Sequence, residues 1–143
     1  MGLAIFELTM KIEQITFQLT WHIRQEVLWP DEPLNYVQLE QDPEGQHYGV
    51  FEGDRLISVI SLFVDGKTAQ FRKFATRKDL QGKGFGSALL QYVLDDIPTH
   101  DINRVWCNAR ADRTSYYHKF GLEETDSRFE KNGERYVIME KSV

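Results

Sequence analysis

The chain has 143 residues, of which 41% are apolar and 27% charged, so it can bury a core, and a disordered chain is excluded. Its formal net charge of −5 argues against a general nucleic-acid or anionic-membrane binder. No apolar run approaches the roughly 20 residues that span a bilayer, and the single cysteine, Cys107, rules out an internal disulfide, so we expect a cytoplasmic location. The length is that of one domain, which we expect to cover residues 1–143.

The N-terminal third begins with a predicted strand and a predicted helix. Residues 1–9 either lengthen the first strand or form an N-terminal extension, and Met10 is an alternative start of the chain. Residues 10–15 alternate polar and apolar side chains, which is typical of a strand. A helix with apolar residues at helical spacing follows and ends at Trp29-Pro30. Residues 31–45 are rich in Pro and Gly, so we expect an irregular segment with one helical turn.

The middle of the chain predicts three successive antiparallel strands. Residues 48–51 and 56–64 flank the sequence Glu52-Gly53-Asp54-Arg55, which is a hairpin signal. Asp65-Gly66-Lys67 forms a second turn, which leads into a strand over residues 69–76. This third strand runs directly toward a glycine-rich loop.

The part that follows the loop predicts two helices, a strand and a hairpin. Apolar residues at three- and four-residue spacing predict a helix that Pro98 stops. Residues 104–108 predict a short buried strand, parallel to the strand before the loop because a helix connects the two. Asp112 is placed to cap a helix over residues 113–120, and two strands around Asn132-Gly133 form a last hairpin. The order β-α-β-β-β-α-β-α-β-β indicates an α+β fold with a mixed sheet.

The glycine-rich loop, Gln-Gly-Lys-Gly-Phe-Gly-Ser at residues 81–87, is the most informative stretch. Glycines before a helix N-terminus let a phosphate approach unpaired backbone N–H groups. A P-loop is excluded because Lys83 precedes Gly84, and a dinucleotide fingerprint is excluded by the G-x-G-x-G spacing. Lys83-Gly84-Phe85-Gly86 also matches half of an RNA-recognition motif, but that motif continues as a strand, whereas a helical pattern follows here.

Two motifs resemble the GNAT superfamily of N-acetyltransferases. Gln81, Gly84 and Gly86 fit the acetyl-CoA pyrophosphate loop of that family, (Arg or Gln)-x-x-Gly-x-(Gly or Ala). A second motif of the family, further along the chain, consists of an aromatic residue, a tyrosine, two polar residues, an apolar residue and then Gly-Phe. Residues 116–122 fit this motif, except that Leu122 replaces the final Phe. The resemblance covers residues 11–141 and is nearest to the ElaA-type branch. It implies a GNAT-like three-layer fold: a mostly antiparallel sheet, helices on both faces, and a splayed parallel strand pair that holds acetyl-CoA.

The resemblance also assigns the residues that bind acetyl-CoA. Backbone N–H groups of the strand before the loop would hold the pantetheine amides and the thioester oxygen, and those of the loop the pyrophosphate. Arg77 and Lys78 would add positive charge near the phosphates. The cofactor-binding set is Phe74, Ala75, Thr76, Gln81, Gly82, Lys83, Gly84, Phe85, Gly86, Ser87 and Asn108. No metal is expected, because the four histidines and one cysteine lack the spacing of metal ligands.

The same resemblance makes Tyr117 the general acid for the departing CoA sulfur. A phenol with a pKa near ~10 stays protonated at neutral pH, so it can donate without special tuning. For the general base, His47 titrates in a useful range. His22, Glu26 and Asp112 remain open as alternatives.

These patterns together predict an N-acetyltransferase that moves an acetyl group, or another acyl group, from its CoA ester to a primary amine of a small molecule or peptide. Transfer would be direct, in a ternary complex, with no nucleic-acid or membrane partner. Acceptor specificity is expected from the first helix, where Arg24 is a candidate, from residues 31–45 and from the C-terminal hairpin, whose edge also suggests a homodimer. Two alternatives stay open: a CoA-binding sensor without turnover, and an RNA-binding domain around residues 83–86.

Overall fold

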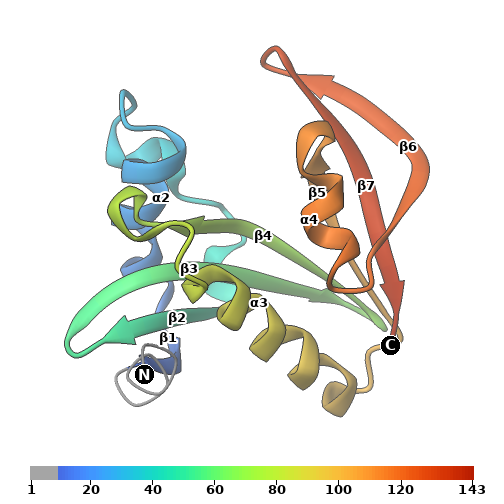
Figure 1. Ribbon diagram of the computed structural model, residues 1–143, viewed down its shortest axis with the longest axis horizontal. Helices are drawn as coiled ribbons and strands as arrows, with labels where there is room; N and C mark the ends of the chain where they lie inside the picture. The colour runs from blue at the N-terminus through green and yellow to red at the C-terminus, as the bar shows by residue number, and fades with distance from the viewer. Residues whose placement is uncertain (1–9) are drawn as a thin grey trace. The chain divides into compact units, whose positions relative to one another are not determined.

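The computed structural model describes residues 10–143 (Figure 1). The strands are β1 (Met10–Ile15), β2 (Gln46–Glu52), β3 (Arg55–Asp65), β4 (Thr68–Thr76), β5 (Arg104–Arg110), β6 (Glu123–Lys131) and β7 (Glu134–Ser142). The α-helices are α2 (Trp21–Leu28), α3 (Phe85–Asp96) and α4 (Thr114–His118). Short 3₁₀ turns are η1 (Phe17–Thr20), η2 (Leu34–Val37), η3 (Asp42–Glu44), η4 (Lys78–Leu80), η5 (Ile97–His100) and η6 (Ala111–Arg113). The predicted element order is confirmed, and the predictions on residues 1–9 lie outside the described part.

The chain forms two compact units that share strands β3 and β4. Of the described residues, the first contains 10–62 together with Lys73–Val93, and its strands follow the order β1-β2-β3-β4. The second contains Phe63–Arg72 and Leu94–Val143, and its strands follow the order β4-β5-β7-β6. Both predicted hairpins of the first three strands are present, and glycines with positive φ occupy their turns, Gly53 at +59° and Gly66 at +61°.

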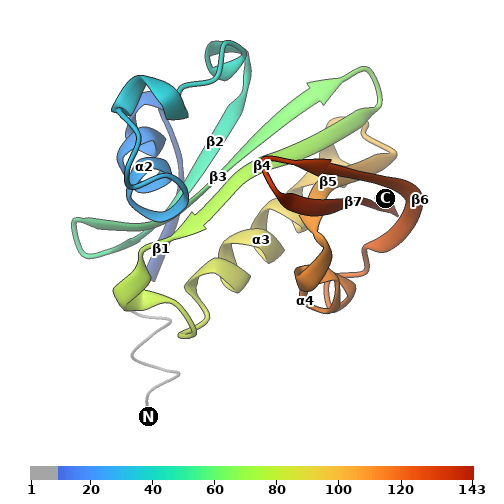
Figure 2. The same ribbon diagram turned by 90° about the horizontal axis from the view of Figure 1, so that it is seen from above.

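In the first unit, helices cover both faces of β4. Ile23 of α2 packs with Val59 and Ala75, so α2 covers the face to which Ala75 points. The first turn of α3 instead contacts the side chains of Phe74 and Thr76. Because successive side chains of a strand point to opposite faces, the two helices lie on opposite sides, as Figure 2 shows. The predicted helices on both faces are thus confirmed for this unit.

In the second unit, the parallel strand pair is short. β4 pairs with β5 only from Thr68↔Arg104 to Gln70↔Trp106, which confirms the predicted parallel direction. β5 pairs antiparallel with β7, and β7 with β6 in the long C-terminal hairpin of Figure 1. Asn132 and Gly133 turn this hairpin with φ of +52° and +81°, the left-handed conformation that this dipeptide favours.

Three local predictions need correction. The first helix is split, because η1 precedes α2. Residues 31–45 contain two 3₁₀ turns instead of one helical turn. Asp112 lies inside η6 and does not cap α4, whose N-cap position is occupied by Arg113. None of the helices in residues 10–143 has the length and apolarity needed to cross a membrane.

Candidate functional site

The glycine-rich loop has a backbone that only glycine adopts without strain. Gly82 and Gly84 have φ of +77° and +93°, and neither would meet a neighbouring atom within 4 Å if it carried a side chain. Conformation rather than space therefore requires glycine there. The Gln81 side chain donates a 2.8 Å hydrogen bond to the Thr76 carbonyl and ties the loop to the end of β4.

Helix α3 begins at Phe85, within this glycine-rich stretch, and lies very close to β4. Its first backbone hydrogen bond runs from the Ala88 N–H to the Gly84 carbonyl, so the N–H groups of the first turn precede the internal ladder. A Cβ on Gly86 would come within 2.9 Å of the Thr76 hydroxyl and 3.2 Å of the Phe74 ring. Gly86 thus permits the close approach that brings the positive end of the helix dipole to the strand.

The last residues of β4 are held from one side by β3. The Ser58 hydroxyl donates to the Ala75 carbonyl at 3.1 Å and shares a 2.8 Å hydrogen bond with the Thr76 hydroxyl. Pairing with β5 ends at Gln70, four residues before Phe74. The backbone of Phe74–Thr76 is therefore fixed by β3 alone among the strand pairings described. Sequence reasoning missed Ser58, because a serine in an apolar strand carries no distinguishing signal.

The basic side chains in and around the loop differ in whether they are exposed or paired with a carboxylate. Arg77 forms a 2.8 Å ion pair with Glu26 and donates from Nε to the Leu56 carbonyl at 2.7 Å. Lys78, before the loop, and Lys83, within it, are both exposed. Arg77 thus fastens α2 to β3, and its charge is already paired. Of the three basic residues, Lys83 lies within the glycine loop itself.

Arg24 and Asp42 form a buried ion pair that no sequence pattern predicted. Both are essentially inaccessible, at 0% and 1% exposure. Arg24 Nη1 donates to Asp42 Oδ2 at 2.8 Å, and Nη2 donates to Asp42 Oδ1 at 2.9 Å and to the Ser61 hydroxyl at 2.8 Å. Burial by itself would raise the pKa of Asp42, but hydrogen bonds from Arg24, the Leu39 N–H and Trp21 outweigh it and hold that pKa below its ordinary value. The sequence had suggested that Arg24 contributes to acceptor specificity. Its side chain is instead buried against Asp42 and Ser61 and does not face an acceptor site.

His47 belongs to the same buried group. Its Nε2 lies 2.8 Å from the Asp42 carbonyl, and its Nδ1 lies 2.7 Å from the Ser61 hydroxyl. A carbonyl only accepts, so Nε2 carries the proton, and Nδ1 accepts from Ser61, whose oxygen in turn accepts from Arg24. Burial lowers the pKa of His47, and the Arg24 charge adds to this against the opposing effect of Asp42. His47 is 3% exposed, and both of its ring nitrogens are hydrogen-bonded. This placement argues against a role as general base, and that role stays a prediction.

The other candidate bases are scattered. His22 on α2 and Asp112 in η6 are exposed, and they lie in different units. Glu26 on α2 is paired with Arg77. Each unit therefore offers its own candidates, and none of them is buried next to a proposed reacting atom.

Tyr117 lies on α4 in the second unit, among aromatic rings. Its ring centroid is 5.9 Å from that of Phe71 and 5.3 Å from that of Tyr116. Burial raises the pKa of its hydroxyl, with smaller contributions from Cys107 and Tyr116. Tyr117 is thus a protonated donor at any physiological pH. Burial likewise raises the pKa of Cys107 to about 12, which makes it a poor nucleophile, while Asn108 beside it on β5 is exposed.

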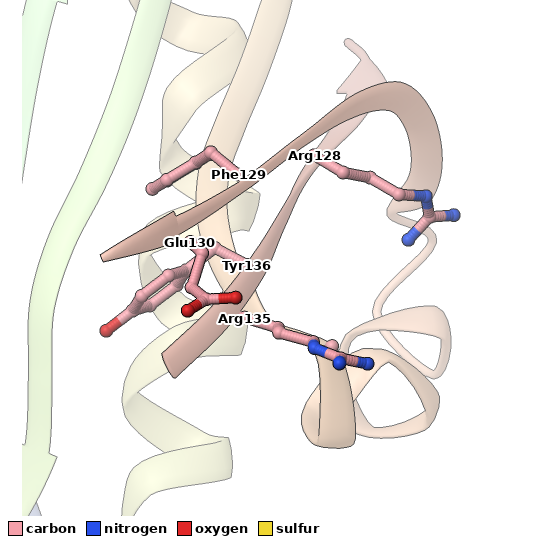
Figure 3. A pocket seen from close by; sticks show the side chains of 6 residues that line it. Arg128, Phe129, Glu130, Arg135 and Tyr136 are labelled. Atoms are coloured by element: carbon pink, nitrogen blue, oxygen red, sulfur yellow. The ribbon is translucent and has the colours of Figure 1, made fainter. Parts of the chain in front are cut away.

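A shallow hollow of about 390 Å³ lies on the C-terminal hairpin (Figure 3). Phe129 and Tyr136 stack within it, with centroids 5.1 Å apart, and Arg128 is hydrogen-bonded to Glu124 at 3.2 Å. None of the residues predicted to bind the cofactor or to catalyse the transfer lines it, although the hairpin as a whole is expected to contribute to acceptor specificity. The lining residues are Ala111, Arg128, Phe129, Glu130, Arg135 and Tyr136. Within residues 10–143, no three His, Cys, Asp or Glu side chains gather in a way that would hold a metal ion.

Comparison with known proteins agrees with this architecture. Residues 25–143 match the model of the acetyltransferase (GNAT) domain. The chain is 27% identical over 144 residues to the uncharacterized N-acetyltransferase YitI of Bacillus subtilis, covering 94% of this chain and 97% of that one.

Two solved structures show the same fold. A GNAT family acetyltransferase from Elizabethkingia anophelis, with acetyl-CoA bound, superposes with a TM-score of 0.75 at 16% identity and covers 94% of this chain and 99% of its own. ElaA of Escherichia coli superposes with a TM-score of 0.72 at 15% identity, covering 92% and 99%.

Proposed function

The chain belongs to the GNAT acetyltransferase family, and on that basis we propose that it transfers an acetyl group from acetyl-CoA to a primary amine of a small molecule or peptide. The observation that carries the proposal is the geometry of the glycine loop. Gly82 and Gly84 hold the left-handed backbone, and Gly86 seats the start of α3 on β4. This arrangement suits a dianionic pyrophosphate and serves no evident packing purpose at Gly82 and Gly84, whose surroundings are open.

The loop would bind the pyrophosphate of acetyl-CoA in two ways. Backbone N–H groups of the loop and of the first turn of α3 would donate hydrogen bonds, and the helix dipole would add a fixed partial positive charge. Lys83 is exposed between the two glycines and supplies a full positive charge to the same anion. Arg77 contributes less, because Glu26 already neutralises it.

The backbone of Phe74–Thr76 would receive the pantetheine arm and the thioester. Pre-positioned N–H groups stabilise the oxyanion that forms when the amine attacks, and they cost little reorganisation if they are rigid. Ser58 provides that rigidity, because its hydroxyl donates to the Ala75 carbonyl and accepts from the Thr76 hydroxyl. The amine nitrogen forms the new C–N bond, the C–S bond breaks, and the sulfur leaves as a thiolate that needs a proton.

Tyr117 is proposed as the donor of that proton. This role follows from the match of Tyr117 to the tyrosine of the family motif, and its hydroxyl is protonated at physiological pH, so it has a proton to donate. The base that deprotonates the acceptor is not assigned to His47, because its two nitrogens are already engaged and it sits beside a buried arginine.

Titration calorimetry with acetyl-CoA, CoA and ATP tests the cofactor site. We expect micromolar binding of acetyl-CoA and CoA and none of ATP. Gly84→Glu should abolish this binding, because it places a carboxylate where the pyrophosphate lies. Gly53→Glu is the matched control, since Gly53 has a similar φ of +59°, equally open surroundings and the same change of charge in the β2–β3 turn.

The outcomes separate the alternatives. Equal affinities for Gly84→Glu and Gly53→Glu would remove the loop from the site. Cofactor binding without acetylation of any amine would favour a CoA-binding sensor. Salt-dependent binding of RNA without binding of acetyl-CoA would favour the RNA-binding alternative.

A further inference from the structure

Strand β6 is exposed on both of its faces. All of its residues except Thr125 are exposed, whereas the neighbouring strand β7 buries Val137 and Met139 completely. β6 is also the outermost strand on its side of the sheet, next to β7 in Figure 1, and within residues 10–143 it pairs with no strand other than β7. Its outer edge therefore presents backbone N–H and C=O groups that can pair with a further strand.

The half of β6 next to the hairpin turn is the part that can accept such a strand. The register with β7 shifts between Glu124 and Arg128, an irregularity of the kind that protects sheet edges. From Arg128 to Lys131 the pairing is regular, and this stretch contains no proline. Phe129 in its middle is 39% exposed, although its ring stacks on that of Tyr136 with 13° between the planes. An apolar ring is thus left partly uncovered where the edge is regular.

We propose that β6 pairs antiparallel with β6 of a second copy of this chain, and that the pairing is centred on Phe129. In this register Phe129 lies opposite Phe129 of the second copy. Arg128 of each copy lies opposite Glu130 of the other, so the two-fold axis produces the same ion pair twice. This inference concerns the assembly of the protein and does not depend on the proposed function.

The charges along β6 restrict the possible registers. Alternate residues of an edge strand point their N–H and C=O groups outward, so two antiparallel copies related by a two-fold axis pair with one residue opposite itself at the centre. A charged residue at the centre would oppose its own charge. This excludes as centres the charged residues of β6, which are Glu123, Glu124, Asp126, Arg128, Glu130 and Lys131.

Three uncharged residues remain as centres, and only Phe129 gives no pair of like charges. Centring on Thr125 would place the adjacent Glu124 opposite an aspartate. Centring on Ser127 would place Glu124 opposite Glu130. Like charges directly opposite each other destabilise a sheet, whereas opposite charges and aromatic pairs stabilise it. Centring on Phe129 provides both of the stabilising kinds.

Both charged side chains of the proposed ion pair are accessible to a second copy. Arg128 donates a hydrogen bond to Glu124 at 3.2 Å, and a guanidinium has five N–H groups, so further donors remain for another carboxylate. Glu130 is exposed, and the ion pairs within residues 10–143 do not include it. Pairing with a second copy therefore breaks no buried interaction.

Sedimentation velocity on the whole protein, across the micromolar to millimolar range, tests the proposal. The wild type should dimerise reversibly within this range, since a single strand pair makes a small interface. Arg128→Glu and Glu130→Arg should each weaken the dimer by about tenfold or more, because the attractive pairs become repulsive. An equimolar mixture of these two variants should associate like the wild type, because each chain then carries the charge that the other lacks.

Glu123→Lys is the matched control. It reverses a charge in the same strand, but residue 123 lies beyond the part of β6 that is paired in the proposed register, so the dissociation constant should equal that of the wild type. In the register centred on Ser127, Glu123 would instead face Lys131, and Glu130→Arg would strengthen the dimer. A stronger dimer in Glu130→Arg therefore overturns the proposed register. Circular dichroism of each variant checks that it is folded.

The other outcomes are equally decisive. A wild type that stays monomeric over the whole range overturns the inference. So does a dimer that both single variants retain, or a mixture of the two that does not associate. If a variant fails to fold, hydrogen exchange of the wild type decides, because the outward N–H groups of residues 127–131 should exchange more slowly as the protein concentration rises. Exchange that is independent of concentration overturns the inference as well.

Discussion

The substitution Asp42→Asn should be among the most destabilising isosteric changes available in this chain. Asp42 Oδ2 accepts hydrogen bonds from Trp21 at 3.1 Å, from Arg24 at 2.8 Å and from the Leu39 N–H at 2.9 Å. Its Oδ1 accepts from Arg24 at 2.9 Å. An amide preserves the shape, but one of the two positions becomes an NH₂ group that faces at least one donor. More importantly, the fully buried Arg24 charge loses its counter-ion.

The magnitude follows from the burial of the pair. Removing one partner of a buried ion pair costs about 3–5 kcal/mol of the free energy of unfolding, because the other charge stays buried without compensation. At about 2.1 cal/mol/K per residue, the 143 residues have an unfolding entropy near 0.3 kcal/mol/K, so Tm should fall by roughly 10–17 °C. Arg24→Met in the Asp42→Asn background removes the stranded charge, so the double variant should be clearly more stable than the sum of the two losses.

Urea and thermal unfolding at neutral pH, followed by circular dichroism, measure these differences. Asp79→Asn is the matched control, because Asp79 pairs with Arg55 at 3.0 Å but both side chains are more than half exposed. It should leave Tm unchanged within error. A loss of less than about 1 kcal/mol for Asp42→Asn, or strict additivity with Arg24→Met, would refute the argument that a buried, mutually compensating pair holds this region together.

Three further changes probe the remaining parts of the molecule. The folded-state pKa of His47 is below its unfolded value of about 6.5, so the free energy of unfolding should decline by up to ~1.4 kcal/mol per pH unit as the pH falls below about 6.5. In urea titrations between pH 7.5 and 5, His47→Gln should flatten this decline. Tyr117→Phe should lower the turnover of acetyl transfer roughly a hundredfold while the calorimetric affinity for CoA is unchanged, and full activity would leave Tyr117 a packing residue. Gly86→Val should weaken CoA binding, because its Cβ would fall 2.9 Å from the Thr76 hydroxyl and push α3 away from β4; unaltered binding would show that the contact is not needed.

The features that could be predicted from the sequence are those with local causes. The Asn132-Gly133 turn, the turns at Gly53 and Gly66, and the glycine loop all depend on residues that adopt positive φ, and that property belongs to the residue itself. The parallel direction of β4 and β5 followed from the helix between them. These local rules were sufficient to place the predicted cofactor loop at the start of a helix.

The features that could not be predicted join residues far apart in the chain. Arg24 meets Asp42 after 18 residues and Ser61 after 37, and all are of types that are mostly exposed in proteins. A polar residue that is buried by a distant partner leaves no periodic signal. His47 was therefore judged by its titration range alone, and Arg24 by its place on the first helix. Lys73, which has a φ of +54° within β4, was equally unpredictable, since lysine has no preference for positive φ.

The protonation states of the buried groups limit where the base can lie. Tyr117 and Cys107 are neutral acids at physiological pH, and burial raises their pKa values further, whereas His47 is a neutral imidazole because burial lowers its pKa. Tyr117 can therefore give a proton, whereas a proton on His47 would put a second positive charge beside Arg24, away from water. In the proposed reaction Tyr117 would protonate the leaving thiolate, whereas we identify no buried group in residues 10–143 that would take the proton of the attacking amine. We therefore expect the acceptor to lose its proton to solvent or to an exposed group such as His22.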